Sequence, residues 1–277
     1  MFRGADVRLP FDNPGRTDPR PQPPRRYSPD EAVALCKGKG YGAFEMFDWR
    51  DPVEAKGYAE AQEKYGLECA CLVANKGVFA EGCSLVDPSE HEGFVREIEA
   101  SIKAARRFDC NNLVVLSGID REGMTHTAQL KNCVTALRMA APVLEKAGMT
   151  AIVEPVNSIV SRPGYFLATA RETFEVIERV GSPNVKCLYD IYHVQIMEGN
   201  IIPTVREKID MIGHFHIGDH PGRHGPGTGE INYPNVLRAI DEVTQAGKFD
   251  GWTAIEYHAK VELPNTMAAV RKLANFG

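Results

Sequence analysis

From residue 27 onward, short apolar runs alternate along the chain with longer segments that mix apolar and polar residues. Short runs rich in Val, Ile and Leu are typical of buried parallel strands, and the longer segments between them are typical of crossover helices. The predicted strands cover 41–47, 67–74, 112–117, 150–156, 185–191, 212–218 and 252–257. The predicted helices cover 29–37, 52–65, 88–108, 124–147, 168–180, 201–209, 233–246 and 263–275.

Seven strands separated by helices predict an α/β fold of the (β/α)8 TIM-barrel type, which needs an eighth strand. Only residues 1–10 can supply it, and their pattern is a weak strand, so we expect the first strand to be weak or incomplete. An open doubly wound sheet is the alternative. The GxGxxG motif that would favour it is missing from the first strand–helix turn.

The N-terminal segment differs from the rest of the chain. Residues 1–30 contain seven of the 18 prolines, and six arginines occur by Arg26. Proline fixes φ and removes a backbone donor, so we expect 10–26 to be an extended arm that lies on the surface, reaches a neighbouring subunit or covers the active site. We therefore divide the chain into an N-terminal extension at 1–26, with the possible first strand, and a single barrel domain at 27–277.

Composition excludes several classes of protein. The 277 residues are 43% hydrophobic and 25% charged, which is typical of a soluble globular chain. A formal charge of −5 disfavours a nucleic-acid partner, and the sequence has no apolar run long enough for a membrane span. The seven cysteines form no CxxC pair and no export signal is evident, so we expect reduced thiols and a cytoplasmic location.

Four successive predicted strands end in an ionisable residue, at the edge where α/β barrels carry their chemistry. These residues are Glu154, Asp190, His216 and Glu256. A single such residue is more often an ion-pair partner or a helix cap, but a buried carboxylate is costly unless it is paired or bound to a cation. Four together favour one shared divalent metal ion. Three carboxylates and one imidazole suit Mn²⁺ best, with Mg²⁺ or Co²⁺ as alternatives.

Two histidines compete for the third ligand position. His214 and His216 lie two residues apart and therefore on the same face of their strand. We prefer His216, which is nearer to the loop that follows the strand, and His214 remains the candidate for a buried core histidine.

The segment 216–233 is the second signal of a functional site. It contains five glycines and two prolines around Arg223. Such a loop can bring its backbone close to a ligand and present one guanidinium to an anionic or carbonyl oxygen, although a plain surface loop is the simpler alternative. A phosphate-binding loop is not expected, because the sequence has no GxxxxGK[ST] motif.

These segments resemble the hydroxypyruvate isomerase family, which belongs to the wider xylose isomerase-like barrels together with ketose 3-epimerases. The resemblance rests on Glu-Pro-Val-Asn at 154–157, Asp-Ile-Tyr-His at 190–193, Pro-Gly-Arg-His-Gly-Pro-Gly-Thr-Gly-Glu-Ile-Asn-Tyr at 221–233, and Glu256-Tyr257. It is strong over about 150–260, diffuse over 27–149 and poor over 1–26.

The resemblance implies a metal-dependent TIM barrel with specific roles for these residues. Glu154, Asp190, His216 and Glu256 would be the metal ligands, Glu154 and Glu256 also the acid–base pair, and His193 and Arg223 would contact substrate. From their positions at other strand ends, we add Asn157 and Glu45 as further candidates for substrate contact, with an ordinary ion pair equally expected for Glu45.

We therefore expect an isomerase that moves a proton next to the carbonyl of a small hydroxycarbonyl compound through an enediolate. Hydroxypyruvate isomerases carry Gln at the third ligand position and ketose epimerases carry His, as here, so a sugar epimerase stays open. Two further alternatives are metal-assisted hydrolysis of the endonuclease IV type, which the net charge disfavours, and a barrel that binds a sugar or a partner subunit without catalysis. A homo-oligomer, dimer or tetramer, is also expected.

Overall fold

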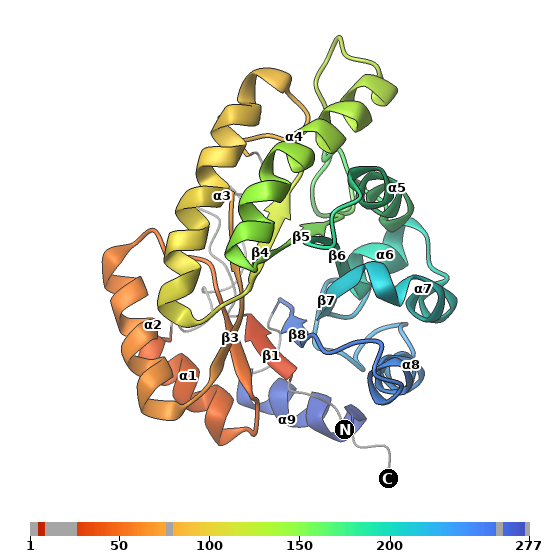
Figure 1. Cartoon of the computed structure of the whole chain (residues 1–277). Coiled ribbons are helices and arrows are strands. Elements are labelled where there is room, and N and C mark those ends of the chain that lie inside the picture. Colours follow the sequence, from red (N-terminus) through yellow and green to blue (C-terminus); the bar gives the residue numbers. More distant parts are fainter. Residues whose placement is uncertain (1–4, 9–26, 76–79, 259–262, 275–277) are drawn as a thin grey trace, which may run out of the picture.

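The computed structural model describes residues 5–8, 27–75, 80–258 and 263–274 of the chain (Figure 1). Eight strands form one parallel sheet in the order β1-β8-β7-β6-β5-β4-β3-β2. The strands at the two ends of this order, β1 and β2, lie beside each other, so the sheet curls into a barrel. The fold is therefore the predicted (β/α)8 TIM barrel.

The strands and helices alternate along the sequence as the hydrophobic pattern predicts. The strands are β1 Ala5–Arg8, β2 Ala43–Met46, β3 Glu68–Val73, β4 Asn112–Leu116, β5 Thr150–Glu154, β6 Val185–Asp190, β7 Ile212–Ile217 and β8 Thr253–Glu256. The α-helices are α1 Pro29–Gly38, α2 Pro52–Tyr65, α3 His91–Ala105, α4 His126–Ala147, α5 Ala170–Val180, α6 Ile191–Met197, α7 Ile201–Lys208, α8 Tyr233–Gln245 and α9 Leu263–Ala274.

Local sequence signals set the helix ends. Ser28 and Glu31 form a reciprocal capping box at the start of α1, which satisfies backbone donors that the helix leaves free. At the other end, Gly66, Gly148 and Gly181 take left-handed conformations after α2, α4 and α5. Glycine adopts this conformation without a steric penalty, which explains why these helices end at glycine.

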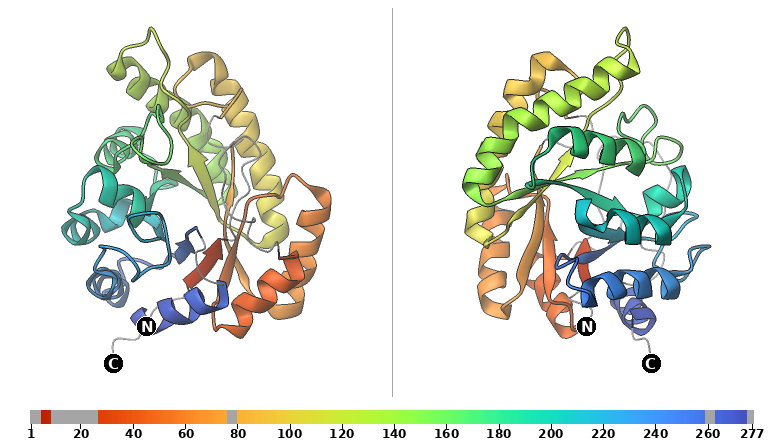
Figure 2. Two further views of the ribbon diagram at one scale, coloured as in Figure 1. Left: turned by 180° about the vertical axis from the view of Figure 1, so that it is seen from behind. Right: turned by 45° about the vertical axis from the view of Figure 1, so that its right-hand side comes forward.

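The helices form an outer layer around the strands (Figure 2). The C-terminal helix α9 packs next to the beginning of β2, where the hydroxyl of Tyr41 donates a hydrogen bond of 2.8 Å to the carbonyl of Met267. Arg271 also donates to the carbonyl of Gly40, at 2.7 Å. These contacts join elements from the two ends of the sequence and help to close the ring.

The period of two along the strands places one set of side chains inside the barrel. Cys71, Val73, Val114, Ile152 and Leu188 form a small apolar cluster that is separate from the main core between strands and helices. The positions two residues further along β5 and β6 are Glu154 and Asp190. Because side chains two apart on a strand share a face, the sheet presents its ionisable strand-end residues above this apolar layer.

The first strand is present at Ala5–Arg8 and pairs with β8 in parallel, with Arg8 opposite Glu256. The expectation of a weak or incomplete first strand is therefore resolved in favour of a paired strand of four residues. The proline-rich arm predicted at 10–26 lies outside the described residues.

One element was not predicted. The pattern placed 185–191 in a strand, but β6 ends at Asp190 and the residues that follow it, Ile191–Met197, form helix α6. Asp190 is the N-cap of α6, and its Oδ1 accepts hydrogen bonds from the backbone amides of Tyr192 and His193. Within the described residues, no helix has the length and apolar character needed to cross a membrane.

A substitution at Gly93 tests how closely α3 packs against the segment that precedes it. A Cβ at Gly93 would lie within 1.9 Å of the Gly82 carbonyl oxygen, whereas a Cβ at Gly38 on α1 would meet nothing within 4 Å. We expect Gly93→Ala to lower the free energy of unfolding by about 1–3 kcal/mol through overpacking. Gly38→Ala should change it by less than about 0.5 kcal/mol or raise it slightly. Urea denaturation measures both values, and equal effects of the two substitutions would contradict the packing described here.

Candidate active site

Four predicted ligands converge from four neighbouring strands of the barrel. Glu154 ends β5, Asp190 ends β6, His216 lies on β7 and Glu256 ends β8. One ligand atom from each of them lies within 4.8 Å of the others. Three of the four side chains are buried and Glu256 is partly exposed, so the cluster lies at the carboxyl end of the strands with Glu256 closest to solvent.

The imidazole of His216 faces the three carboxylates through Nδ1. This nitrogen lies 2.7 Å from Oε2 of Glu256, 3.9 Å from Oε1 of Glu154 and 4.0 Å from Oδ2 of Asp190. Nδ1 is buried, and its close contact with the Glu256 carboxylate is an ion-pair contact. Burial lowers the pKa of His216, but the carboxylates of Glu45 and Glu256 outweigh it and raise this pKa well above its ordinary value.

Arg223 supplies positive charge to the same carboxylates. Its Nη2 lies 2.7 Å from Oδ2 of Asp190 and 2.8 Å from Oε2 of Glu256, and its guanidinium lies over the ring of Tyr192. The buried Nε has no hydrogen-bond partner among the described residues. Arg223 therefore links two of the predicted ligands and keeps one donor for another group.

His193, on the first turn of α6, is held by Asn157. The backbone amide of Asn157 donates to Nδ1 of His193 at 3.3 Å, and the Asn157 side-chain nitrogen lies 2.6 Å from the same atom. Since Nδ1 accepts, the proton of a neutral ring is on Nε2, which lies 3.5 Å from Oδ2 of Asp190 and 3.9 Å from Oε1 of Glu154. Burial lowers the pKa of His193 to about 3, with Asp190 opposing the shift, so the ring is neutral at pH 7.

Asn157 was predicted to contact substrate, and the structure gives it contacts that orient other groups. Its Oδ1 accepts hydrogen bonds of 2.9 Å from the backbone amides of Val160 and Ser161, and the side chain is fully buried. These bonds fix the amide, which in turn fixes the ring of His193.

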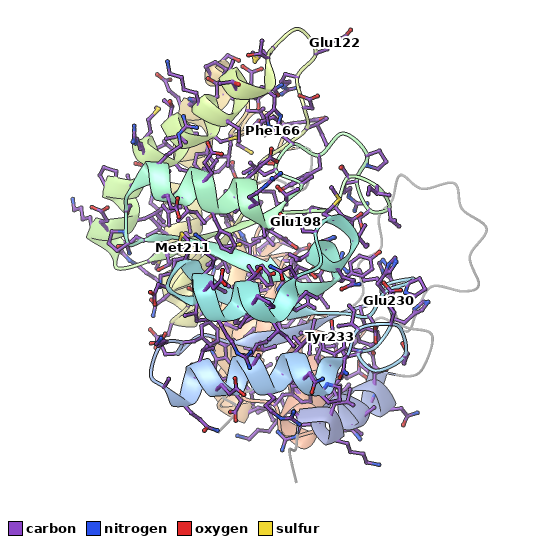
Figure 3. All side chains as sticks on the ribbon, turned by 90° about the vertical axis from the view of Figure 1, so that its right-hand side faces the viewer. Glu122, Phe166, Glu198, Met211, Glu230 and Tyr233 are labelled. Atoms are coloured by element: carbon purple, nitrogen blue, oxygen red, sulfur yellow. The ribbon has the colours of Figure 1, made fainter. Side chains whose placement is uncertain are left out.

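The glycine-rich loop between β7 and α8 carries Arg223 to the cluster. Asp219 is buried in this loop, and its two oxygens accept hydrogen bonds from the backbone amides of Gly227 and Ile231 at 2.8 and 3.1 Å. At the far end of the loop, Tyr233 donates a hydrogen bond of 2.6 Å to the carbonyl of Gly218. Figure 3 labels Tyr233 and Glu230 where the loop leads into α8.

Asp219 and Gly229 are contributors to the site that the sequence reasoning did not single out. A Cβ at Gly229 would lie within 2.2 Å of the His220 carbonyl oxygen, so the loop folds tightly only with glycine here. A carboxylate inside a glycine-rich loop is a signal that its oxygens accept loop amides, and this signal could have identified Asp219.

Glu45 lies deeper in the barrel than its predicted role requires. Its Oε1 lies 2.8 Å from Nε2 of His214, 2.9 Å from Nε2 of His216 and 3.0 Å from Sγ of Cys71, and the Glu45 side chain is fully buried. Strands β2 and β7 are not neighbours in the sheet, so these contacts cross the barrel interior. The position of Glu45 in the barrel interior favours a contact with His216 over direct contact with substrate.

The residues fit a divalent metal ion. Three carboxylate oxygens and one imidazole nitrogen form a mixed donor set of the kind that Mn²⁺, Mg²⁺ and Co²⁺ accept. His216 meets the usual requirement of a ligating histidine, because Nε2 contacts the carboxylate of Glu45 while the buried Nδ1 faces the other three carboxylates without a hydrogen bond.

Comparison with known proteins identifies the family. The profile of the xylose isomerase-like TIM barrel family matches residues 33–276. The hydroxypyruvate isomerase of Escherichia coli strain K12 is 35% identical over 227 residues, which cover 82% of this chain and 85% of that protein. The chain therefore belongs to the xylose isomerase-like TIM barrels and, within them, to the hydroxypyruvate isomerase family.

Solved structures agree with the fold. The crystal structure described as an AP endonuclease of family 2 from Brucella melitensis superimposes with a TM-score of 0.81 at 25% identity, covering 98% of this chain and 99% of that chain. A D-psicose 3-epimerase from Clostridium cellulolyticum H10 superimposes with a TM-score of 0.70 at 17% identity, covering 91% of this chain and 87% of that chain. The family assignment establishes an enzyme of the isomerase class, and the superposition on the epimerase supports the fold alone.

The pKa of His193 leads to a prediction for the pH dependence of stability. The folded-state pKa of His193, about 3, is below its ordinary value of 6.5. As the pH falls below 6.5, the His193 ring therefore becomes protonated in the unfolded chain but stays neutral in the folded chain. The stability associated with a neutral His193 is thus full above this pH and declines by about 1.4 kcal/mol per pH unit below it.

We expect His193→Gln to remove this contribution. Unfolding with urea in the presence of a chelator, at pH values from 7.5 to 5, should show a smaller loss of stability in the variant than in the wild type. Parallel stability curves for the two proteins would mean that His193 titrates normally in the folded state.

Proposed function

We propose that the chain is a divalent-metal-dependent isomerase of a small hydroxycarbonyl compound, with hydroxypyruvate as the first substrate to test. The observation that supports this most strongly is the convergence of Glu154, Asp190, His216 and Glu256 on one point at the carboxyl end of the barrel. The reaction would convert hydroxypyruvate to its aldehyde isomer by moving a proton from the hydroxymethyl carbon to the neighbouring carbonyl carbon.

These four residues would hold the metal ion, which we propose to be Mn²⁺, with Mg²⁺ or Co²⁺ as alternatives. When bound, such an ion would polarise the substrate carbonyl and lower the energy of the negative charge that develops when the adjacent C–H bond breaks. The mixed set of oxygen and nitrogen donors supports this choice over a structural zinc site, which favours sulfur and nitrogen ligands.

Glu154 and Glu256 are proposed as the acid–base pair. One carboxylate would take the proton from carbon to give an enediolate, and the other carboxyl group would return a proton to the neighbouring carbon. They come from β5 and β8, on opposite sides of Asp190 and His216 in the strand order, so a substrate between them would meet a carboxylate on each side. The net result moves hydrogen without consuming a co-reactant.

His193 and Arg223 would bind and orient the substrate. The neutral His193 ring has its proton on Nε2, on the side of Asp190 and Glu154, and can donate it to a hydroxyl or carbonyl oxygen. Arg223 retains the buried Nε–H donor without a partner among the described residues, which suits an anionic oxygen such as the carboxylate of hydroxypyruvate. Asn157 would act through His193.

A ketose 3-epimerase is the second candidate. The observation that favours it is His216 at the third ligand position, which the family resemblance associates with sugar epimerases. The same acid–base pair would then remove a proton from one face of a carbon and return it to the opposite face. A small-molecule substrate is common to both candidates, and the expected homo-oligomer and cytoplasmic location stay predictions.

The substrate is tested by assaying the Mn²⁺-loaded protein with hydroxypyruvate and with a panel of ketoses. Turnover of hydroxypyruvate to its aldehyde isomer is the expected result. Epimerisation of a ketose without hydroxypyruvate turnover would favour the second candidate, and no turnover of any compound by a metal-loaded protein would contradict both.

Glu256→Gln is the sharpest single substitution for the mechanism. We expect it to lower kcat at least about 100-fold, because a positioned general acid or base contributes about 10²–10⁴-fold. Circular dichroism and metal content should be measured on the same sample, so that loss of catalysis is separated from loss of fold or metal. Glu97→Gln on α3, which removes a carboxylate paired with Arg50 outside the barrel, is the matched control. Wild-type activity in Glu256→Gln would exclude Glu256 from the proton transfer.

A further inference from the structure

A second cluster of polar side chains lies beneath the proposed metal site. It consists of Glu45 on β2, Cys71 on β3 and His214 and His216 on β7, and all four side chains are buried. His216 belongs to both clusters, because its Nδ1 faces Glu154, Asp190 and Glu256 while its Nε2 faces Glu45. The two nitrogens of one imidazole ring thus connect the lower cluster with the proposed site.

The contacts of Glu45 determine which nitrogen of His216 carries a proton. Oε1 of Glu45 lies 2.9 Å from Nε2 of His216, and a carboxylate can only accept a hydrogen bond. Nε2 must therefore donate, and in a neutral ring this leaves the lone pair on Nδ1, the atom that faces the three carboxylates.

His214 and Cys71 hold Glu45 in position. His214 contacts Oε1 through Nε2 at 2.8 Å and Cys71 contacts it through Sγ at 3.0 Å. Together with Nε2 of His216, three donors from two strands converge on one oxygen. Rotation of the Glu45 carboxylate would break all three contacts in a fully buried place. The cost of leaving a buried donor without a partner makes this a rigid arrangement.

We infer that Glu45, held by His214 and Cys71, is a positioning residue that fixes His216 with Nδ1 available to the metal ion and thereby sets the metal affinity. The inference rests on the proposed function in one respect, namely that His216 binds a metal ion. It assigns Glu45 no contact with substrate and so favours the ion pair, the other of the two expectations from its strand-end position. Carboxylates that orient ligating histidines typically change metal affinity about 10–100-fold when removed.

A second metal ion in the lower cluster is the competing explanation. Glu45, Cys71, His214 and His216 offer oxygen, sulfur and nitrogen atoms within 4.8 Å of one another. Such an ion would require His216 to bind metal through both nitrogens, and Nε2 would then carry no proton. The number of metal ions bound per chain separates this explanation from ours.

The test compares Mn²⁺ binding by the wild type, Glu45→Gln and Glu97→Gln, with free Mn²⁺ measured by electron paramagnetic resonance. Gln is nearly isosteric with Glu but neutral, and its amide can donate as well as accept, so it no longer enforces a donating Nε2. We expect one Mn²⁺ per chain in the wild type, a dissociation constant raised 10–100-fold in Glu45→Gln, and a wild-type value in Glu97→Gln. The absorption spectrum of bound Co²⁺ should shift in Glu45→Gln alone.

A dissociation constant for Glu45→Gln within threefold of the wild type, with an unchanged Co²⁺ spectrum, overturns the inference. If the wild-type chain binds two metal ions and shows a thiolate-to-Co²⁺ absorption band, the inference is overturned in favour of a second metal ion in the lower cluster. If Glu45→Gln does not fold, ¹⁵N NMR of histidine-labelled, Mg²⁺-loaded wild type decides. A protonated Nε2 on His216 supports the inference and an unprotonated Nε2 contradicts it. Wild type that binds Mn²⁺ without turnover contradicts the proposed reaction but not the inference.

Discussion

The site depends on the electrostatic cost of burying several carboxylates inside one barrel. Glu45, Glu154, Asp190 and Glu256 all face the barrel interior or its carboxyl end, and each would be unfavourable there without a compensating charge. Arg223 places its Nη2 2.7 Å from Oδ2 of Asp190 and 2.8 Å from Oε2 of Glu256, whereas burial lowers the pKa values of His193 and His214 and so disfavours the charged form of these two rings. The proposed divalent cation would supply further positive charge to Glu154, Asp190 and Glu256.

Separate elements of the fold position the side chains of this cluster. Parallel strands bring Glu154, Asp190 and Glu256 to one edge of the sheet, and the start of α6 adds His193 within one helical turn of Asp190. The loop before α8 brings in Arg223, and the hydrogen bonds of Asp219 to two loop amides hold that loop in shape. Asp190 has two roles, since one oxygen caps α6 while the other contacts Arg223.

Much of this arrangement could be predicted because it is encoded locally. The period of the apolar runs gave seven of the eight strands, and the rule that barrel chemistry lies at strand ends identified the four converging residues. Residue Asp190 also carried an unused signal: an Asp after an apolar run is a strong helix N-cap, and it marks the start of α6. The short first strand was the least certain because four residues next to a proline-rich segment give little pattern.

What could not be predicted depends on contacts between distant segments. Glu45 meets His214 across 169 positions of sequence, and only the curvature of the closed sheet brings β2 and β7 together. A strand-end position alone therefore left substrate contact and an ordinary ion pair equally expected for Glu45, and the structure shows its carboxylate against His214 and His216. Asn157 likewise makes a contact that the sequence pattern did not indicate, since its fully buried side-chain nitrogen lies 2.6 Å from Nδ1 of His193, and its contact with substrate stays a prediction.

The most direct test of the account is a crystal structure of the Mn²⁺-loaded protein with anomalous diffraction recorded at the manganese absorption edge. We expect one anomalous peak per chain, bounded by Glu154, Asp190, His216 and Glu256, with Nδ1 of His216 directed at the ion. A peak among Glu45, Cys71 and His214, or the absence of a peak between the four proposed ligands in Mn²⁺-saturated crystals, would contradict it.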